Sequence, residues 1–94
     1  MYVRVGSFIT VRIKDRTYYL SKTQAEFLLR IADSDTGFLD KMFSERRHAY
    51  YRTIFKLKRK GLIDGRGRPY RLTPEGEAVV KVLRLALGGG GSEV

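Results

Sequence analysis

Residues 44–73 constrain the fold of this chain more than any other stretch. They have the pattern of a basic helix that ends at Gly61 and continues directly into a short hairpin. Residues 44–72 hold ten Lys and Arg against two Asp and Glu, so they carry a net charge of +8 out of the chain's +9. Positive charge concentrated in this way indicates a long anionic partner, and duplex nucleic acid is the commonest one.

The helical part of this stretch has two distinct faces. At 100° per residue, Tyr50, Ile54 and Leu57 fall on one narrow stripe, which predicts the buried face. The residues on the opposite face are His48, Arg52, Lys56 and Arg59, with Tyr51 and Phe55 on its flank. We expect Ser44 to cap the start of this helix and Gly61 to end it. A solvated helix surface can also carry such charges, but the basic hairpin that follows favours a binding surface.

Composition narrows the class of protein. Ninety-four residues form one small domain, and the absence of cysteine excludes disulfides, thiolate catalysis and Cys-ligated zinc. An intracellular location is therefore expected. His48 is the only histidine, and no residues have the pattern of an acid–base pair, so we expect no metal, no other cofactor and no enzyme activity. No apolar run has the length of a membrane span, so no membrane partner is expected.

Residues 1–20 carry the strand signal. Apolar and polar residues alternate between residues 8 and 13, and β-formers dominate residues 17–20 after a polar turn. This pattern predicts a β-hairpin, with a looser strand at residues 2–5. A lone hairpin is marginally stable in water, so it must pack on the helices or pair with a second chain.

Helical signals begin after the hairpin. Ser21 and Gln24 have the spacing of a capping box. A turn is expected at residues 33–37 and a short second helix at residues 38–43. Beyond the basic helix, glycine-rich residues 64–68 predict a turn between two short strands. The final helix is expected to begin with Thr73 as its cap and Pro74 in its first turn.

The final helix, residues 74–87, is apolar around more than half of its circumference. A helix docked on a small core needs an apolar stripe of only about 100°. The surplus predicts a second partner, most simply another copy of the chain, so a homodimer is expected. The predicted dimer interface consists of Val79, Val82, Leu83, Ala86 and Leu87. Residues 88–94 are predicted to form a flexible Gly-rich tail.

Two short runs resemble parts of a winged helix-turn-helix domain. Residues 57–63, Leu-Lys-Arg-Lys-Gly-Leu-Ile, look like the end of a recognition helix that enters the first wing strand. Residues 70–76, Tyr-Arg-Leu-Thr-Pro-Glu-Gly, look like the second wing strand entering the next helix. This pair is common in MarR-like, PadR-like and small archaeal transcription regulators, and the resemblance covers residues 21–87.

The resemblance implies an α+β fold: a winged helix-turn-helix with an extra N-terminal β-hairpin and a C-terminal helix. The implied divisions are the hairpin at residues 1–20, the helix-turn-helix and wing at 21–73, the C-terminal helix at 74–87 and the tail at 88–94. MarR-type proteins are longer and dimerise through extra terminal helices, whereas this chain has a hairpin at its N-terminus. No segment is left over for an effector-binding domain, so no small-molecule effector is expected.

The resemblance also implies a function. Such domains bind double-stranded DNA with the basic helix in the major groove and the wing on the backbone or in the minor groove. By this resemblance the chain would be a homodimeric transcription regulator in the cytoplasm, associated with the nucleoid. The residues at the matching positions are Arg46, Arg47, His48, Tyr51, Arg52 and Lys56 on the helix and Arg66 and Arg68 on the wing.

Two other functions remain open: an RNA-binding winged helix, and a protein-interaction winged helix within a larger assembly. The basic helix face argues against the second. Aromatic side chains of the helix could also stack on unpaired bases. The helical stripe places Tyr50 in the core, however, and only Tyr51 among these aromatics is expected to be exposed.

Overall fold

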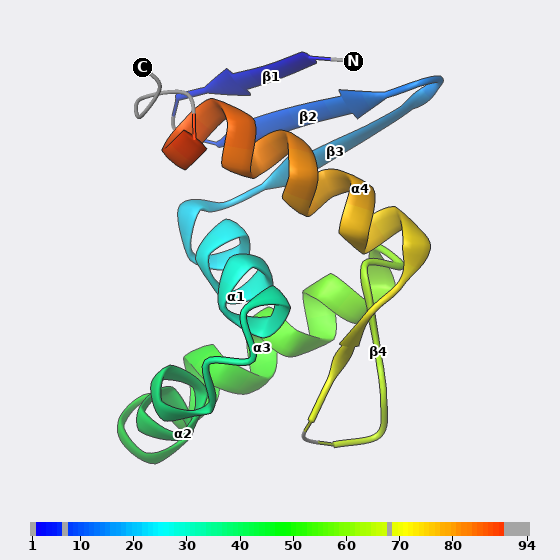
Figure 1. Ribbon diagram of the computed structural model, residues 1–94. Coiled ribbons are helices and arrows are strands. Elements are labelled where there is room, and N and C mark those ends of the chain that lie inside the picture. The colour runs from blue at the N-terminus through cyan, green and yellow to red at the C-terminus, as the bar shows by residue number, and fades with distance from the viewer. Residues whose placement is uncertain (1, 7, 68, 90–94) are drawn as a thin grey trace.

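The computed structural model describes the backbone of residues 2–6, 8–67 and 69–89 and the side chains of residues 6, 8–67 and 69–86. Within these residues the chain has an α+β fold with a three-stranded sheet, a two-stranded ribbon and four α-helices (Figure 1). The strands are β1 (Tyr2–Val5), β2 (Ile9–Ile13), β3 (Arg16–Leu20), β4 (Ile63–Asp64) and β5 (Arg71–Leu72). The helices are α1 (Lys22–Ala32), α2 (Thr36–Glu45), α3 (Arg47–Arg59) and α4 (Pro74–Leu83), followed by the π-helical segment η1 (Arg84–Gly89).

The N-terminal sheet is antiparallel in the order β1-β2-β3. The predicted hairpin is confirmed, with Thr10 of β2 opposite Tyr19 of β3, and β1 pairs with the other edge of β2. Because side chains alternate across a strand, Ile9 and Val11 are buried on one face while Tyr19 is exposed on the other. The sheet packs against α4 through β1 and β2, so the hairpin is stabilised within its own chain.

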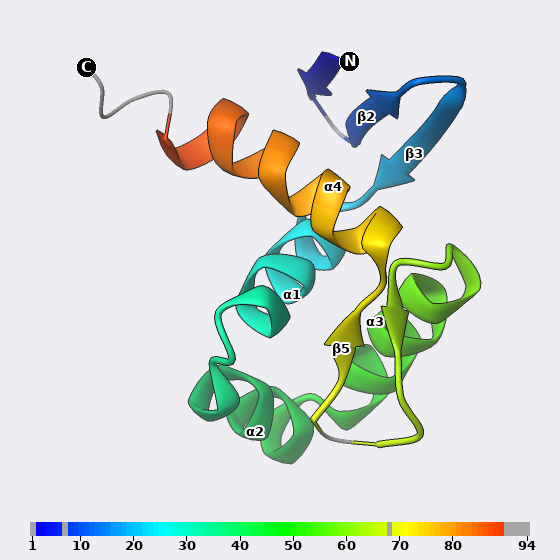
Figure 2. The same cartoon turned by 45° about the vertical axis from the view of Figure 1, so that its right-hand side comes forward.

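Helix α4 lies between two layers of the same chain. The sheet contacts it on one side, and α1 and β5 contact it on the other (Figures 1 and 2). A helix covered from two sides buries more than a single narrow stripe. This arrangement explains the wide apolar face that the sequence shows.

The predicted dimer interface is therefore corrected. Val79, Val82 and Leu83 are buried in the core of their own chain and cannot meet a second copy without unfolding. Leu85, which is 62% exposed, and Ala86 remain on the surface. The side chain of Leu87 lies outside the described residues, as do residues 90–94 of the predicted tail, while residues 88 and 89 form the end of η1.

The structure confirms the predicted cap at the start of α1 but not the cap predicted at Ser44. The capping box is confirmed, because Ser21 Oγ accepts the Gln24 N–H at 3.0 Å and Gln24 Oε1 accepts the Ser21 N–H at 3.3 Å. The cap predicted at Ser44 is wrong, since α2 continues through it to Glu45. The cap of α2 is Asp35, whose Oδ1 accepts the Phe38 N–H at 3.1 Å, so the helix begins two residues earlier than predicted.

The end of α3 and the start of α4 are tied together at Thr73. Its hydroxyl donates to the Gly61 carbonyl oxygen at 2.6 Å and accepts the Gly76 N–H at 3.0 Å, and its own N–H donates to the Leu62 carbonyl oxygen at 3.1 Å. Gly61 has a φ of 76°, which confirms the left-handed end of the basic helix. The predicted cap of the final helix is confirmed. The same hydroxyl also joins the start of α4 to the residue that ends α3.

We expect Thr73→Ala to lower the free energy of unfolding by about 1–2 kcal/mol, because it removes the cap of α4 and the bond to Gly61. Urea denaturation followed by circular dichroism measures this loss. Thr73→Ser keeps the hydroxyl and should recover most of the stability. Thr23→Ala, at an exposed position of α1, is the matched control, and a loss of equal size there would contradict the role of Thr73.

Candidate nucleic-acid interface

Helix α3 presents one buried and one exposed face. The predicted stripe is confirmed, because Tyr50, Ile54 and Leu57 are all buried. Thr53 is buried as well, which the apolar pattern did not indicate. Its hydroxyl donates to the Ala49 carbonyl oxygen at 2.7 Å, so the polar group is satisfied inside the helix.

All helix residues predicted to meet DNA lie on the surface. Those with exposed side chains are Arg46, Arg47, His48, Tyr51, Arg52 and Lys56. Arg59 is exposed beside them, and Phe55 is 58% exposed, so Tyr51 is not the sole exposed aromatic residue of this helix as the sequence predicted. At the helical angle, Phe55 shares the outward side with Arg52 and Arg59.

The cations of α3 are not neutralised by acidic side chains. The helix contains five Lys and Arg and no Asp or Glu. Within the described part of the chain, none of these five forms an ion pair. Three of them lie over aromatic rings instead: Arg47 over Phe43 at 4.6 Å, Lys58 over Tyr70 at 5.2 Å and Arg59 over Phe55 at 5.7 Å. A cation over a ring keeps its full charge, so the positive potential of this face is retained.

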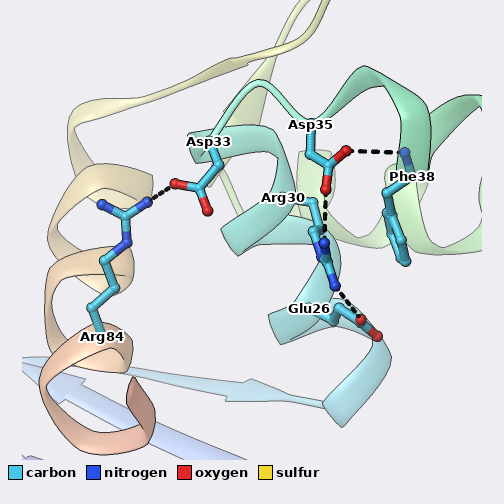
Figure 3. A network of polar contacts seen from close by, with 6 residues as sticks. All are labelled: Glu26, Arg30, Asp33, Asp35, Phe38 and Arg84. Carbon is cyan, nitrogen blue, oxygen red and sulfur yellow. Dashed lines mark hydrogen bonds and ion pairs between the residues drawn. The ribbon is translucent and has the colours of Figure 1, made fainter. Parts of the chain in front are cut away.

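Two arginines of other helical segments, Arg30 and Arg84, are paired with carboxylates. Figure 3 shows Arg30 of α1 bonded to Asp35 at 2.7 Å and to Glu26 at 3.4 Å, while Arg84 pairs with Asp33. The Phe38 N–H and the Arg30 guanidinium hold the pKa of Asp35 below its usual range, and the bond to Asp35 raises the pKa of Arg30. The charges of these two arginines are therefore balanced locally.

The N-terminal half of α3 is held by aromatic contacts with α2. Phe43 lies edge-on to Tyr50 at 5.4 Å and to Tyr51 at 5.9 Å, and Arg47 covers its ring. Burial raises the pKa of the Tyr50 phenol, with further contributions from the neighbouring Tyr70 and Tyr51, so this group stays neutral at any ordinary pH. These contacts position Arg47 and Tyr51 on the surface near the start of the helix.

A single residue, Arg46, separates α2 from α3. Its backbone N–H donates to Met42 at 2.8 Å and its carbonyl accepts from Tyr50 at 2.8 Å, but no side chain caps the first turn of α3. The first backbone N–H groups of a helix favour an anion, and here two arginines, Arg46 and Arg47, flank them. The start of α3 is accordingly a favourable place for a phosphate.

The β4–β5 ribbon extends from the end of α3 and lies beside that helix (Figure 2). Its turn is set by Gly65, which has a φ of 124° and an N–H that donates to Asp64 Oδ1 at 2.8 Å. Arg66 and Arg71 are exposed on the ribbon. The predicted site residue Arg68 lies outside the described residues. The exposed cations of the ribbon therefore add to those of α3.

Two kinds of feature are absent from the residues with described structure. No group of three His, Cys, Asp or Glu residues among them could hold a metal ion. No helix formed by these residues is both long and apolar enough to cross a membrane.

Comparisons with protein-family models, with curated proteins and with solved structures yielded no match for this chain.

Proposed function

We propose that this chain binds double-stranded DNA through α3 and the β4–β5 ribbon. The observation that carries this proposal is the state of the cations on α3. Four of the five are exposed and Lys58 is half-buried, none faces a carboxylate within the described residues, and the opposite side of the helix is buried. An α-helix fits the major groove, and cations on its outer face meet phosphates and the acceptor edges of guanine.

In this proposal the arrangement is a winged helix-turn-helix, with α3 as the recognition helix and the β4–β5 ribbon as the wing. Arg47 and Arg52 are the candidates for base contacts, because arginine donates two hydrogen bonds to one guanine. Arg66 at the ribbon turn is the candidate for a backbone contact. A DNA-binding domain of this kind would act as a transcription regulator and would be found on the nucleoid.

The proposal predicts a steep dependence of DNA affinity on salt. If Arg46, Lys56 and Arg66 each meet one phosphate, log K falls with log salt concentration with a slope of about −2.7. The affinity would then fall about 40-fold between roughly 50 and 200 mM salt. Fluorescence anisotropy with a labelled blunt duplex measures this slope, and the same titration gives the number of chains bound per duplex.

A variant of the ribbon tests its part in the salt dependence. Arg66→Ala should reduce the magnitude of the slope by about 0.9 and weaken binding to all duplex sequences alike. Lys81→Ala, at an exposed site on α4, is the control and should leave the slope unchanged. A flat salt dependence would refute the proposal, and tighter binding of an RNA duplex of the same sequence would favour the RNA-binding alternative.

A further inference from the structure

A hollow lies where the N-terminal sheet meets the C-terminal half of α3. Its volume is about 460 Å³, within the roughly 300–1,000 Å³ typical of ligand sites. Three aromatic side chains line it: Phe8 from the bend directly before β2, Tyr19 from β3, and Phe55 from α3. Phe8 and Tyr19 are each 62% exposed and Phe55 is 58% exposed. Rings of this size gain free energy by burial, so their gathering in one open hollow indicates a ligand that covers them.

Cations alternate with these rings. Lys56, Arg59 and Lys60 line the same hollow, and no Asp or Glu of the described residues does. The Arg59 guanidinium lies 5.7 Å from the centre of the Phe55 ring, so a flat group stacked on that ring would also lie near a positive charge. The amide of Gln24, a further lining residue, has two N–H donors for the polar edge of a ligand. The lining thus combines flat apolar faces with positive charge.

We propose that this hollow binds a short unpaired segment of single-stranded DNA. Its bases would stack on Phe8, Tyr19 and Phe55, since every base has a face that stacks on an aromatic ring. Its phosphates would be neutralised by the three cations. An acidic peptide would satisfy the cations but leave the rings exposed to water, so the combination of the two favours a nucleic acid strand.

The hollow continues from the surface proposed to meet duplex DNA. Lys56 belongs to both surfaces, and Phe55 and Arg59 lie on the outward side of the same helix. A strand that leaves a duplex bound along α3 would therefore reach the hollow directly. The choice of DNA over RNA rests on the proposed function, and the substrate that follows is a duplex with an unpaired end.

Binding to the hollow is tested with a fluorescent side chain placed inside it. The chain contains no tryptophan, so a Tyr19→Trp variant provides a single reporter that stacked bases quench. An oligothymidylate should quench this reporter and bind at least about tenfold more tightly than an abasic oligomer of the same length, because only the first can stack. Equal affinities would show attraction by charge alone and would overturn the proposal. Tighter binding of an oligouridylate would overturn the assignment to DNA.

Side-chain variants locate the binding surface. Phe8→Ala combined with Tyr19→Ala should weaken oligothymidylate binding at least about tenfold, while Tyr19→Phe keeps the ring and should bind as the unchanged chain does. Leu85→Ala is the matched control, because Leu85 is also 62% exposed but does not line the hollow. Circular dichroism establishes that each variant is folded. Loss of binding in Leu85→Ala as large as in the double variant would contradict the assignment.

A junction substrate separates this inference from the proposed function. A duplex with a single-stranded thymidine overhang should bind at least about tenfold more tightly than the blunt duplex, and Phe8→Ala with Tyr19→Ala should abolish that gain without changing blunt-duplex affinity. If the blunt duplex binds and the overhang adds nothing, the hollow proposal fails while the proposed function stands. If oligothymidylate binds and quenches while the blunt duplex does not bind, the proposed function fails and the hollow proposal stands.

Discussion

Gly76→Ala should destabilise the fold by about 2–3 kcal/mol and lower Tm by roughly 10–20 °C. Gly76 is buried in the first turn of α4. A Cβ atom placed there would overlap the carbonyl oxygen of Leu62 and lie 3.0 Å from its carbonyl carbon. That oxygen already accepts the Thr73 N–H, so relief of the overlap requires α4 to move away from the end of α3. The helix propensity gained from alanine, about 1 kcal/mol, is too small to offset this overlap.

Gly37→Ala provides the matched control for this prediction. Gly37 is also helical, in α2, but a Cβ there meets only Asp35 Oδ1 at 3.8 Å, an ordinary contact. We expect Gly37→Ala to be neutral or to stabilise by up to about 1 kcal/mol. Thermal and urea denaturation of both variants measure the contrast. Equal stabilities for the two variants would show that the Leu62 backbone moves aside at little cost. The fold would then not require glycine at position 76.

Features set by neighbouring residues could be predicted from the sequence. The capping box at Ser21 and the cap at Thr73 depend on side chains within three residues of the backbone they bond, so spacing alone identifies them. The buried stripe of α3 follows from helical geometry in the same way. A glycine inside a helical pattern, such as Gly76, indicates a packing requirement without indicating which segment it packs against.

Features that depend on distant partners could not be predicted in the same way. Ser44 is a suitable cap by residue type, but α2, which packs against α1 and α3, continues through it to Glu45. The wide apolar face of α4 in the sequence indicated that much of this helix is buried. It did not indicate which segment covers it. The chain's own sheet covers the side that the sequence assigned to a second copy.

The candidate site likewise has one part that could be predicted from the sequence and one part that could not. The exposed face of α3 was predictable, since one helix carries all of its residues. The hollow was not, because Phe8 and Tyr19 precede Phe55 by more than thirty positions in the sequence. Each of the three rings is exposed on its own segment, but only the fold gathers them in one place.

Charge reversal on α3 should nearly abolish DNA binding. Arg52→Glu combined with Lys56→Glu removes two cations from the exposed face and places two carboxylates against the phosphates. We expect an affinity loss of at least about 100-fold, because two charge-assisted contacts are lost and repulsion is added. Neither side chain forms an ion pair within the described residues, so the change breaks no salt bridge there and the fold should persist, which circular dichroism checks.

The control for charge reversal changes the net charge equally at another surface. Lys14, at the turn between β2 and β3, and Lys81, on α4, are both exposed, and their change to glutamate should cost less than about tenfold. Equal losses in the two double variants would show a general attraction by net charge rather than binding by α3. Arg52→Lys refines the result, because it keeps the charge but loses the two-donor fork. It should weaken binding to a selected site by about 1–3 kcal/mol and leave binding to random duplex almost unchanged.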